Sequence, residues 1–272
     1  MTAVAADAAT LAHPGPPPHR TWGALSDALV LTERNLIAYL RIPEALFFSS
    51  VQPVMFVLLF RYVFGGAIRV PGQSYVNFLM PGIFVQTMAF GAVSTSVGLA
   101  EDLHKGLIER FRSLPMARSA VLAGRTTADL IRNVVVAAVI TAVGYGVGFR
   151  IQTSVLAFLA GVGVVLAFSY ALSWGFAIVG LSASNSETAQ VMAFPILFPL
   201  TFASSAFVPV ATLPGWLQAF ARHQPVSVVI DAARALMLGG PTAGPVEAAL
   251  AWCAGLLVVL APLAVRRYRR SV

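Results

Sequence analysis

The chain alternates between long apolar stretches and short polar segments. A bilayer core of about 30 Å requires roughly 20 residues of helix. Because the apolar runs are continuous rather than alternating, they predict transmembrane helices and not the strands of a β-barrel. The third run is short and should begin near Leu130, whereas the fourth is long enough to tilt. The six predicted spans are residues 45–64, 78–100, 133–149, 155–181, 191–210 and 248–265.

Two segments precede these runs. Residues 1–20 contain Pro-Gly-Pro-Pro-Pro at 14–18, which predicts a disordered N-terminal arm. In residues 21–44, charged residues interrupt apolar residues that recur at helical spacing. This pattern is typical of an amphipathic helix on the membrane surface, and an extension of the first span is the alternative. The apolar positions are Trp22, Leu25, Leu29, Leu36 and Leu40.

The basic residues predict the orientation of the spans. If the N-terminus lies inside, most of the 18 Lys and Arg residues fall in inside segments. By the positive-inside rule, both termini are then cytoplasmic. Residues 45–265 are predicted to form one membrane domain, and residues 266–272 a basic cytoplasmic tail that begins with Arg-Arg-Tyr-Arg-Arg. The basic residues in outside segments are Arg69, Arg150, Arg222 and Arg234.

The composition excludes several classes of protein. Hydrophobic residues make up 58% of the chain and charged residues 11%, against about 25% charged residues in soluble domains. A soluble enzyme and a disordered chain are therefore both excluded. A single cysteine, Cys253, allows no disulfide framework, and the four histidines are scattered, so we expect no metal site.

The one lysine of the chain limits its use of nucleotides. A Walker A loop needs a lysine followed by Ser or Thr after a glycine-rich run. Here Lys105 is followed by Gly106, so this chain cannot build such a loop. We therefore expect no cofactor on this chain, and any ATP that it uses must be bound by another polypeptide.

The polar segment 101–115 predicts a short amphipathic cytoplasmic helix that ends at Pro115. Glu101 and Lys105 are four residues apart and can form an ion pair. The helix is either a connector between two spans or a docking helix for a groove on a cytoplasmic partner. Its apolar face carries Leu103, Leu107, Phe111 and Leu114, and its charged face Asp102, Lys105, Glu109 and Arg112.

The outside segment 211–247 predicts two further helices. Pro214 lies near the start of the first, where proline is tolerated. The second runs from Val226 to Leu238 and is stopped by glycines, and its Asp231 and Arg234 can pair. The two helices either cap or dip into the outer leaflet, or are local helices of an outer loop. The first has its apolar residues at helical spacing, namely Leu213, Trp216, Leu217 and Phe220.

Polar groups within the predicted spans are sparse. The sequence shows no chain of buried carboxylates for ion coupling and no inverted repeat, which argues against a secondary transporter. Without an HExxH motif or a Ser/His/Asp set, a membrane hydrolase is disfavoured as well. Gly144 and Gly148 form a small-xxx-small pair that favours close helix packing.

Four segments, in order, resemble one known family. They are QPVMFVLLFRYVFGGAI at 52–68, NFLMPGIFVQT at 77–87, the stretch 101–125 with its Glu-Arg at 109–110 and Leu-Pro at 114–115, and 204–227. Together they are similar to type-2 ABC-transporter permeases of the daunorubicin-resistance type. The likeness covers roughly residues 30–265.

This resemblance implies an architecture and a set of partners. The fold would be an all-α membrane protein with six transmembrane helices, an N-terminal connecting helix, a cytoplasmic coupling helix and outer re-entrant helices. Two permease subunits would pair, as a homodimer or a heterodimer, above two cytoplasmic ATP-binding subunits that carry ATP and Mg. The 101–115 helix would couple to those subunits through Leu103, Leu107, Glu109, Arg110, Phe111 and Arg112.

The resemblance also implies a transport path and a location. The path would follow the dimer interface near the second and fifth spans, and the protein would lie in the inner or plasma membrane of the cell. No nucleic-acid partner is expected. The outer re-entrant segment would include Pro214, Trp216 and Phe220. Candidate path residues are Gln86, Met88, Phe90, Phe194, Phe198 and Phe202.

The expected function is that of a permease subunit without catalytic residues of its own. The ATP-driven exporter would move a hydrophobic or amphipathic drug, antibiotic or lipid out of the cytoplasm or the inner leaflet. A permease for lipid-linked polysaccharide is the alternative substrate class, and only four Trp and six Tyr weakly disfavour it. A membrane scaffold that binds a cytoplasmic partner without transporting anything is the alternative from a different class.

Overall fold

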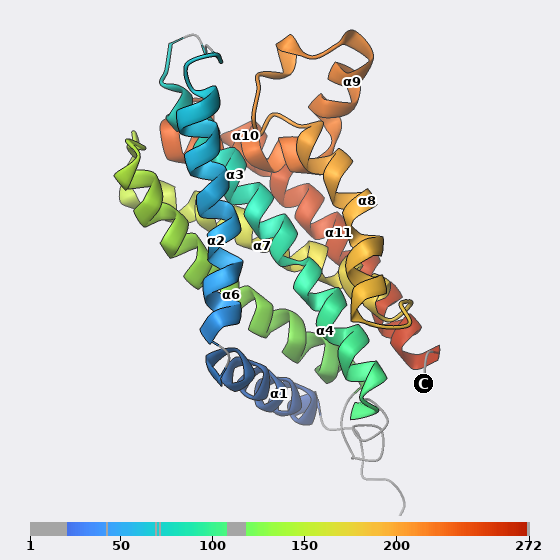
Figure 1. Ribbon diagram of the computed structural model, residues 1–272. Helices are drawn as coiled ribbons and strands as arrows, with labels where there is room; N and C mark the ends of the chain where they lie inside the picture. Colours follow the sequence, from blue (N-terminus) through green and yellow to red (C-terminus); the bar gives the residue numbers. More distant parts are fainter. Residues whose placement is uncertain (1–20, 42, 69, 71, 108–117, 271–272) are drawn as a thin grey trace, which may run out of the picture.

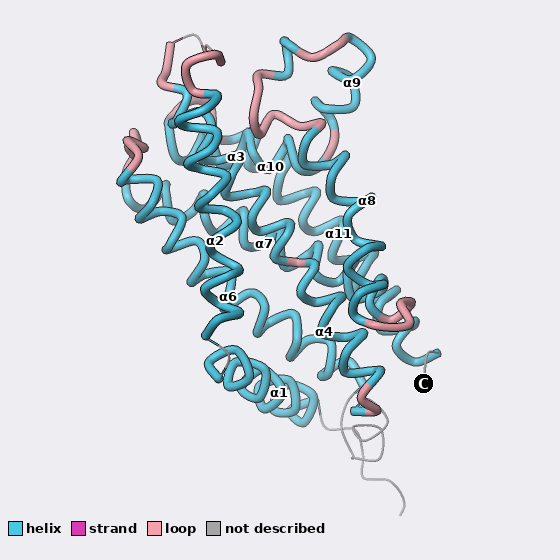
Figure 2. The backbone as a smooth tube through the Cα atoms, in the orientation of Figure 1, coloured by secondary structure: helices cyan, strands magenta, loops and turns pink. Residues whose placement is uncertain are grey.

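The computed structural model describes residues 21–41, 43–68, 70, 72–107 and 118–270. All regular elements in this described part are helical, as Figure 2 shows by its cyan helices and pink connections. The predicted all-α class is therefore confirmed. The elements are α1 (Thr21–Arg41), α2 (Pro43–Leu59) with a π-helical turn (Phe60–Phe64), α3 (Tyr75–Gly91), α4 (Val93–His104), α6 (Arg118–Gly146), α7 (Val155–Gly180), α8 (Ser186–Phe202), a 3₁₀ turn (Val210–Thr212), α9 (Gly215–His223), α10 (Pro225–Leu238) and α11 (Ala243–Arg270).

Four helical stretches are long and apolar enough to cross a membrane. They are Tyr75–His104, which joins α3 and α4, and Ser119–Gly146, Val155–Gly180 and Ala243–Arg270. Two further apolar helices, α2 and α8, have 17 residues each. The long apolar helices confirm an integral membrane protein, and α7 begins and ends within a residue of the prediction for 155–181.

Helix α1 lies across one end of the bundle, at the bottom of Figure 1. It covers Thr21–Arg41 of the amphipathic helix predicted for residues 21–44, and the next helix begins already at Pro43. The face with Leu31 and Asn35 is buried and packs on α6, while Leu25, Leu29 and Leu40 are exposed. These three leucines of the apolar pattern therefore point away from the protein, which suits contact with a membrane surface.

The core has two main parts. Helix α7 lies at the centre and packs against α3, α4, α6, α10 and α11. The larger part surrounds Phe84 and Phe168, and a second part, near α1, contains Leu122 and Trp174. Tyr268 also belongs to this second part, so α11 continues through the Arg-Arg-Tyr-Arg-Arg segment as an ordered helix up to Arg270.

Two predicted span boundaries are wrong, and each has a physical reason. The third span was predicted to begin near Leu130, whereas α6 begins at Arg118. Arg125, Asp129 and Arg132 in its first half pair with one another, so these charges can be accommodated within the packed helix. The fifth span was predicted to reach residue 210, whereas α8 ends at Phe202. Beyond it the Ser204 hydroxyl donates to the Thr201 carbonyl, which closes a buried turn.

Glycines allow close approach at two places in the bundle. A Cβ atom on Gly82 would lie 2.4 Å from the carbonyl oxygen of Ala206, so α3 meets the turn after α8 backbone to backbone. Gly144 packs against Met80, as the small-xxx-small pattern predicts. Gly148 does not share this role, because it lies beyond α6 with a φ of +101° and has open space around it.

Candidate functional site

Phenylalanine rings from α2, α3, α8 and the following turn form a continuous surface. The ring of Phe90 lies 6.2 Å from that of Phe194 and 5.9 Å from that of Phe198. Phe202 continues the series, with its ring centre 5.2 Å from Phe198 and 5.2 Å from Phe207. These separations are typical of favourable aromatic pairs. The structure thus brings together four of the predicted path residues.

A second arm of rings reaches the same point from α2. The ring of Phe56 lies 6.0 Å from that of Phe60, which stacks on Phe207 at 4.4 Å. The two arms therefore meet at Phe207. The rings on α8 are more than a third exposed, so this surface is accessible from outside the subunit. We call it the aromatic wall, and its members are Phe56, Phe60, Phe90, Phe194, Phe198, Phe202 and Phe207.

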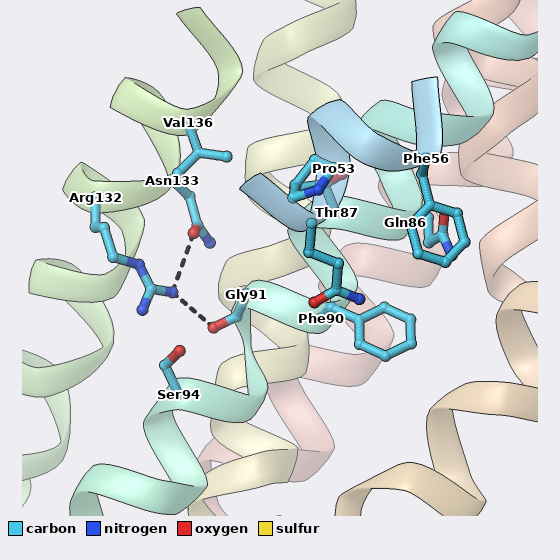
Figure 3. Close-up of a pocket in the computed structure, with 11 residues that line it drawn as sticks. Pro53, Phe56, Gln86, Thr87, Phe90, Gly91, Ser94, Arg132, Asn133 and Val136 are labelled. Atoms are coloured by element: carbon cyan, nitrogen blue, oxygen red, sulfur yellow. Dashed lines mark hydrogen bonds between the residues drawn. The ribbon is translucent and has the colours of Figure 1, made fainter. Parts of the chain in front are cut away.

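A small cavity lies where the two arms begin. It is bounded by α2, α3, the start of α4 and α6, and its volume is about 160 Å³. Figure 3 shows the side chains around it, with Phe56 and Gln86 on one side and Arg132 and Asn133 on the other. Its lining residues are Gln52, Pro53, Phe56, Gln86, Thr87, Phe90, Gly91, Ser94, Arg132, Asn133 and Val136.

The two remaining predicted path residues lie in different surroundings. Gln86 lines this cavity and is 4% exposed. Met88 is buried in the larger core, and its backbone carbonyl accepts a hydrogen bond from the Ser169 hydroxyl. The structure therefore groups Gln86 with Phe56 and Phe90 around the cavity, whereas Met88 is buried in the core and does not line the cavity.

A buried ionic cluster adjoins the cavity on α6, and the sequence reading missed it. Asp129 is fully buried, and its carboxylate lies 3.7 Å from Arg125 and 3.8 Å from Arg132. The Thr95 hydroxyl donates a hydrogen bond of 2.5 Å to Asp129, and the Tyr39 hydroxyl donates another. Asp129 is a single carboxylate paired with arginines, so it is not the kind of carboxylate chain for ion coupling that the sequence analysis considered.

The cluster joins four helices. Tyr39 belongs to α1, Thr95 to α4, and the charged residues to α6. Burial and the neighbouring Asp129 carboxylate raise the pKa of Tyr39 to about 12, so its phenol keeps the proton that it donates. Arg132 also donates to the Gly91 carbonyl at 2.7 Å and to Asn133, whose amide donates to Ser169 on α7. A signal for this site was present in the sequence, as the i, i+4 and i, i+3 spacing of Arg125, Asp129 and Arg132.

The predicted coupling segment is only partly described. The expected uninterrupted helix over 101–115 is wrong, because α4 ends at His104 and Gly106 has a φ of +67°. The expected pair of Lys105 and Glu101 is confirmed, at 2.6 Å on the surface. Leu103 packs against the second core, and Leu107 is half-buried. Glu109, Arg110, Phe111 and Arg112 lie outside the described residues.

The two helices predicted within residues 211–247 are confirmed as α9 and α10. Pro214 is the N-cap of α9, and Trp216 and Phe220 on this helix are 78% and 44% exposed. In Figure 1, α9 stands apart from the bundle at the top of the view. Helix α10, by contrast, is deeply packed against α3, α7 and α11, and it ends at Gly239, whose φ is +95°.

The predicted ion pair within α10 is also confirmed and has a further role. Arg234 lies 2.9 Å from Asp231 and donates to the carbonyls of Ser205 and Phe78. Its guanidinium also lies over the Phe78 ring at 4.1 Å. Arg234 lies in the helix that the sequence predicts for this segment, and it fastens α10 to α3 and to the turn after α8.

Comparison with known proteins finds a match over most of the chain. Residues 27–238 match a family model described as ABC-2 type transporter. The chain is 37% identical to the daunorubicin resistance ABC transporter permease protein DrrB1 of Streptomyces coeruleorubidus, over 91% of this chain and 88% of that protein.

Two further relatives with lower identity also match most of the chain. One is the probable doxorubicin resistance ABC transporter permease protein DrrC of Mycobacterium tuberculosis, 30% identical over 91% of this chain and 90% of that protein. The other is the putative transport permease ycf38 of Cyanophora paradoxa, 24% identical over 78% of this chain and 74% of that protein. The matched region contains the aromatic wall, the cavity and the ionic cluster.

Proposed function

Because the chain belongs to the ABC-2 type transporter family, we propose that this permease subunit exports a hydrophobic or amphipathic compound such as a drug, an antibiotic or a lipid. A permease subunit of this family is not itself catalytic, and the ATPase of such a transporter is a separate chain. ATP and Mg would therefore be bound by that partner. The compound would leave the cytoplasm or the inner leaflet of the cell membrane.

The aromatic wall is the observation that carries the proposed substrate class. Its rings extend from Phe90 on α3 through Phe198 to Phe202 on α8, and the rings on α8 are partly exposed. The rings of the wall are flat and uncharged. They can therefore make dispersion contacts with an apolar molecule. Two relatives carry drug resistance in their names, which agrees with an apolar or amphipathic cargo.

A second permease subunit would complete the path. The exposed apolar residues of α8, including Val191 and Ile196, would face the partner subunit or the cargo. With α2 and α8 counted beside the four longer helical stretches, six helices would cross the membrane and both termini would be cytoplasmic. Pro214, Trp216 and Phe220 would lie in the outer leaflet, where Trp is favoured.

The segment after α4 would couple the permease to the ATP-binding subunit. Leu103 and Leu107 would anchor it, and Glu109, Arg110, Phe111 and Arg112 would contact the partner. Its place directly after α4 supports this role, because α4 also holds Thr95 of the ionic cluster and lies next to the cavity. A displacement of the segment would therefore act on the helix that borders the proposed path.

The experiment that tests the function uses the chain with its cognate ATP-binding subunit. The two should co-purify, and reconstituted vesicles should export a hydrophobic fluorescent compound only when ATP is supplied. The chain alone should hydrolyse no ATP. Robust ATP hydrolysis by this chain alone would contradict the assignment, and co-purification without export would favour the scaffold interpretation.

A further inference from the structure

We propose that the cavity between α2, α3 and α6 binds an anionic, oxygen-rich group at the polar end of the exported amphiphile. The chemistry is that of a carboxylate or a phosphate, and the apolar body of the same molecule lies along the aromatic wall. This inference rests on the proposed export function and adds the charge of the substrate to it.

The size of the cavity limits what it can hold. Sites for drug-sized molecules have volumes of about 300–1,000 Å³, whereas this cavity has about 160 Å³. It can therefore take one polar group and not a whole drug-sized molecule. Phe56 and Phe90 line the cavity and also begin the two arms of the aromatic wall. A molecule with its polar end in the cavity would thus place its apolar part against the phenylalanine rings of the aromatic wall.

The polar side chains of the cavity call for a hydrogen-bonding ligand. Gln86 is 4% exposed and Thr87 is 9% exposed, and neither side chain has a hydrogen-bond partner within the described part of the chain. Buried polar groups in proteins are nearly always paired, because an unpaired one lowers the stability of the fold. Gln52, on the opposite wall, is exposed and likewise makes no hydrogen bond with a described residue.

The charge of the surroundings favours an anion. Arg125 and Arg132 share the single carboxylate of Asp129, so the cluster has one positive charge in excess. Arg132 is 7% exposed and lines the cavity. No acidic side chain lines the cavity in that part of the chain. In a poorly solvated site, this arrangement attracts an anion and repels a cation.

The test uses two probes with the same apolar body and opposite charge. Tritiated naphthylbutanoate and naphthylbutyltrimethylammonium are titrated against the full chain in nanodiscs of phosphatidylcholine, with empty nanodiscs as background. The anionic probe should bind saturably and at least about tenfold more tightly, since charge-assisted hydrogen bonds are the strong ones. The same two probes are then offered for ATP-driven efflux by the reconstituted complex.

Two variants separate ligand binding from folding. Gln86→Leu removes an amide that has no partner in the described structure, so the melting temperature should stay the same or rise while the affinity for the anionic probe falls about tenfold. Gln224 is equally buried, at 5%, but donates to the Leu200 carbonyl at 2.8 Å. Gln224→Leu should therefore lower the melting temperature and leave the affinity of the anionic probe unchanged.

Variants at Arg132 test the sign of the charge. Arg132→Gln should abolish the preference for the anionic probe, and Arg132→Lys should retain it in part. Equal affinity of the wild-type chain for both probes, or unchanged anion binding by well-folded Gln86→Leu, would overturn the proposal. Anion binding without efflux of the anion, in a complex that exports other compounds, would assign the cavity to a resident lipid headgroup and overturn the substrate assignment. If the complex exports nothing, the export function itself fails.

Discussion

Asp129 is the residue on which the polar interior of this protein depends. It is fully buried and compensates two arginines of its own helix while it accepts hydrogen bonds from α1 and α4. Replacing a buried ion pair by apolar groups can be neutral, but removing one partner leaves an uncompensated buried charge. A single carboxylate at this position therefore supports the placement of α1 and α4 against α6.

We expect Asp129→Asn to destabilise the protein strongly. The amide keeps the shape but removes the negative charge, so two buried arginines face each other, and the cost should be about 3–5 kcal/mol. Thermal melting of the purified protein measures the effect. Glu101→Gln is the control, because Glu101 pairs with Lys105 on the surface and should cost less than about 1 kcal/mol. Equal melting of both variants would contradict the importance of the cluster.

We expect Gly82→Ala to separate α3 from the turn after α8. The new Cβ would lie 2.4–2.9 Å from backbone atoms of Ala206, which cannot move aside as a side-chain tip can. Overpacking of this kind costs about 1–3 kcal/mol. Gly163→Ala is the matched control within α7, because a Cβ there meets nothing within 4 Å. The control should be neutral or slightly stabilising in a thermal melt, since alanine is the better helix former. A Gly82→Ala protein as stable as this control would contradict the close backbone contact.

At the scale of elements, α6 shows what the sequence can and cannot predict. Its apolar second half was found from hydropathy, but the first half was assigned to a loop because it carries Arg125, Asp129 and Arg132. A hydropathy average counts every charged residue as if its side chain had to be solvated by water. The spacing of the three residues indicates that they can pair, but their burial depends on how α1 and α4 pack beside them, and that information is not in the local sequence. Helix α7 has no such charges, and its bounds were predicted correctly.

The segment after α4 is expected to transmit force to the ATP-binding subunit. Phe111→Ala removes a large apolar anchor of the kind that costs above about 2 kcal/mol at a binding hot spot. It should therefore reduce co-purification of the ATP-binding subunit. Pull-down of that subunit from membranes with equal amounts of the permease measures the loss.

A charge reversal in the same segment is expected to affect coupling and not folding. Glu109→Lys should leave membrane insertion and expression near normal but abolish export, because charge complementarity governs partner recognition. Arg150→Glu is the control, since Arg150 is exposed and is predicted to lie on the other side of the membrane. Efflux is measured beside expression for each variant. Normal export by both Glu109→Lys and Phe111→Ala would reduce the segment to a connector.

At the scale of the whole molecule, the predicted order of the helices along the chain agrees with the structure. Which helices lie close together in space does not follow from the sequence. The residues Phe90 and Phe198 could be grouped in advance only through the family resemblance, because they are far apart in the chain. Their contact, and the meeting of both ring series at Phe207, depends on how α3, α8 and the turn after α8 pack. Met88 is the counterexample: it is two residues from Phe90 on α3, yet it faces the core.

The orientation of the whole molecule in the membrane gives a further prediction. The Arg-rich end of α11 and the turn after α4 should both face the cytoplasm, because basic residues collect there. In a Cys253→Ala background, which removes the only native thiol, single cysteines at the exposed positions Lys105 and Arg270 should be shielded from an impermeant thiol reagent in intact cells. A cysteine at Ala219, on the exposed surface of α9, should react. After the cells are opened, all three should be labelled, which shows that shielding comes from the membrane and not from burial. If Arg270→Cys were labelled from outside intact cells while Lys105→Cys stayed shielded, an odd number of helices would cross the membrane between the two positions. The six-helix arrangement would then be wrong.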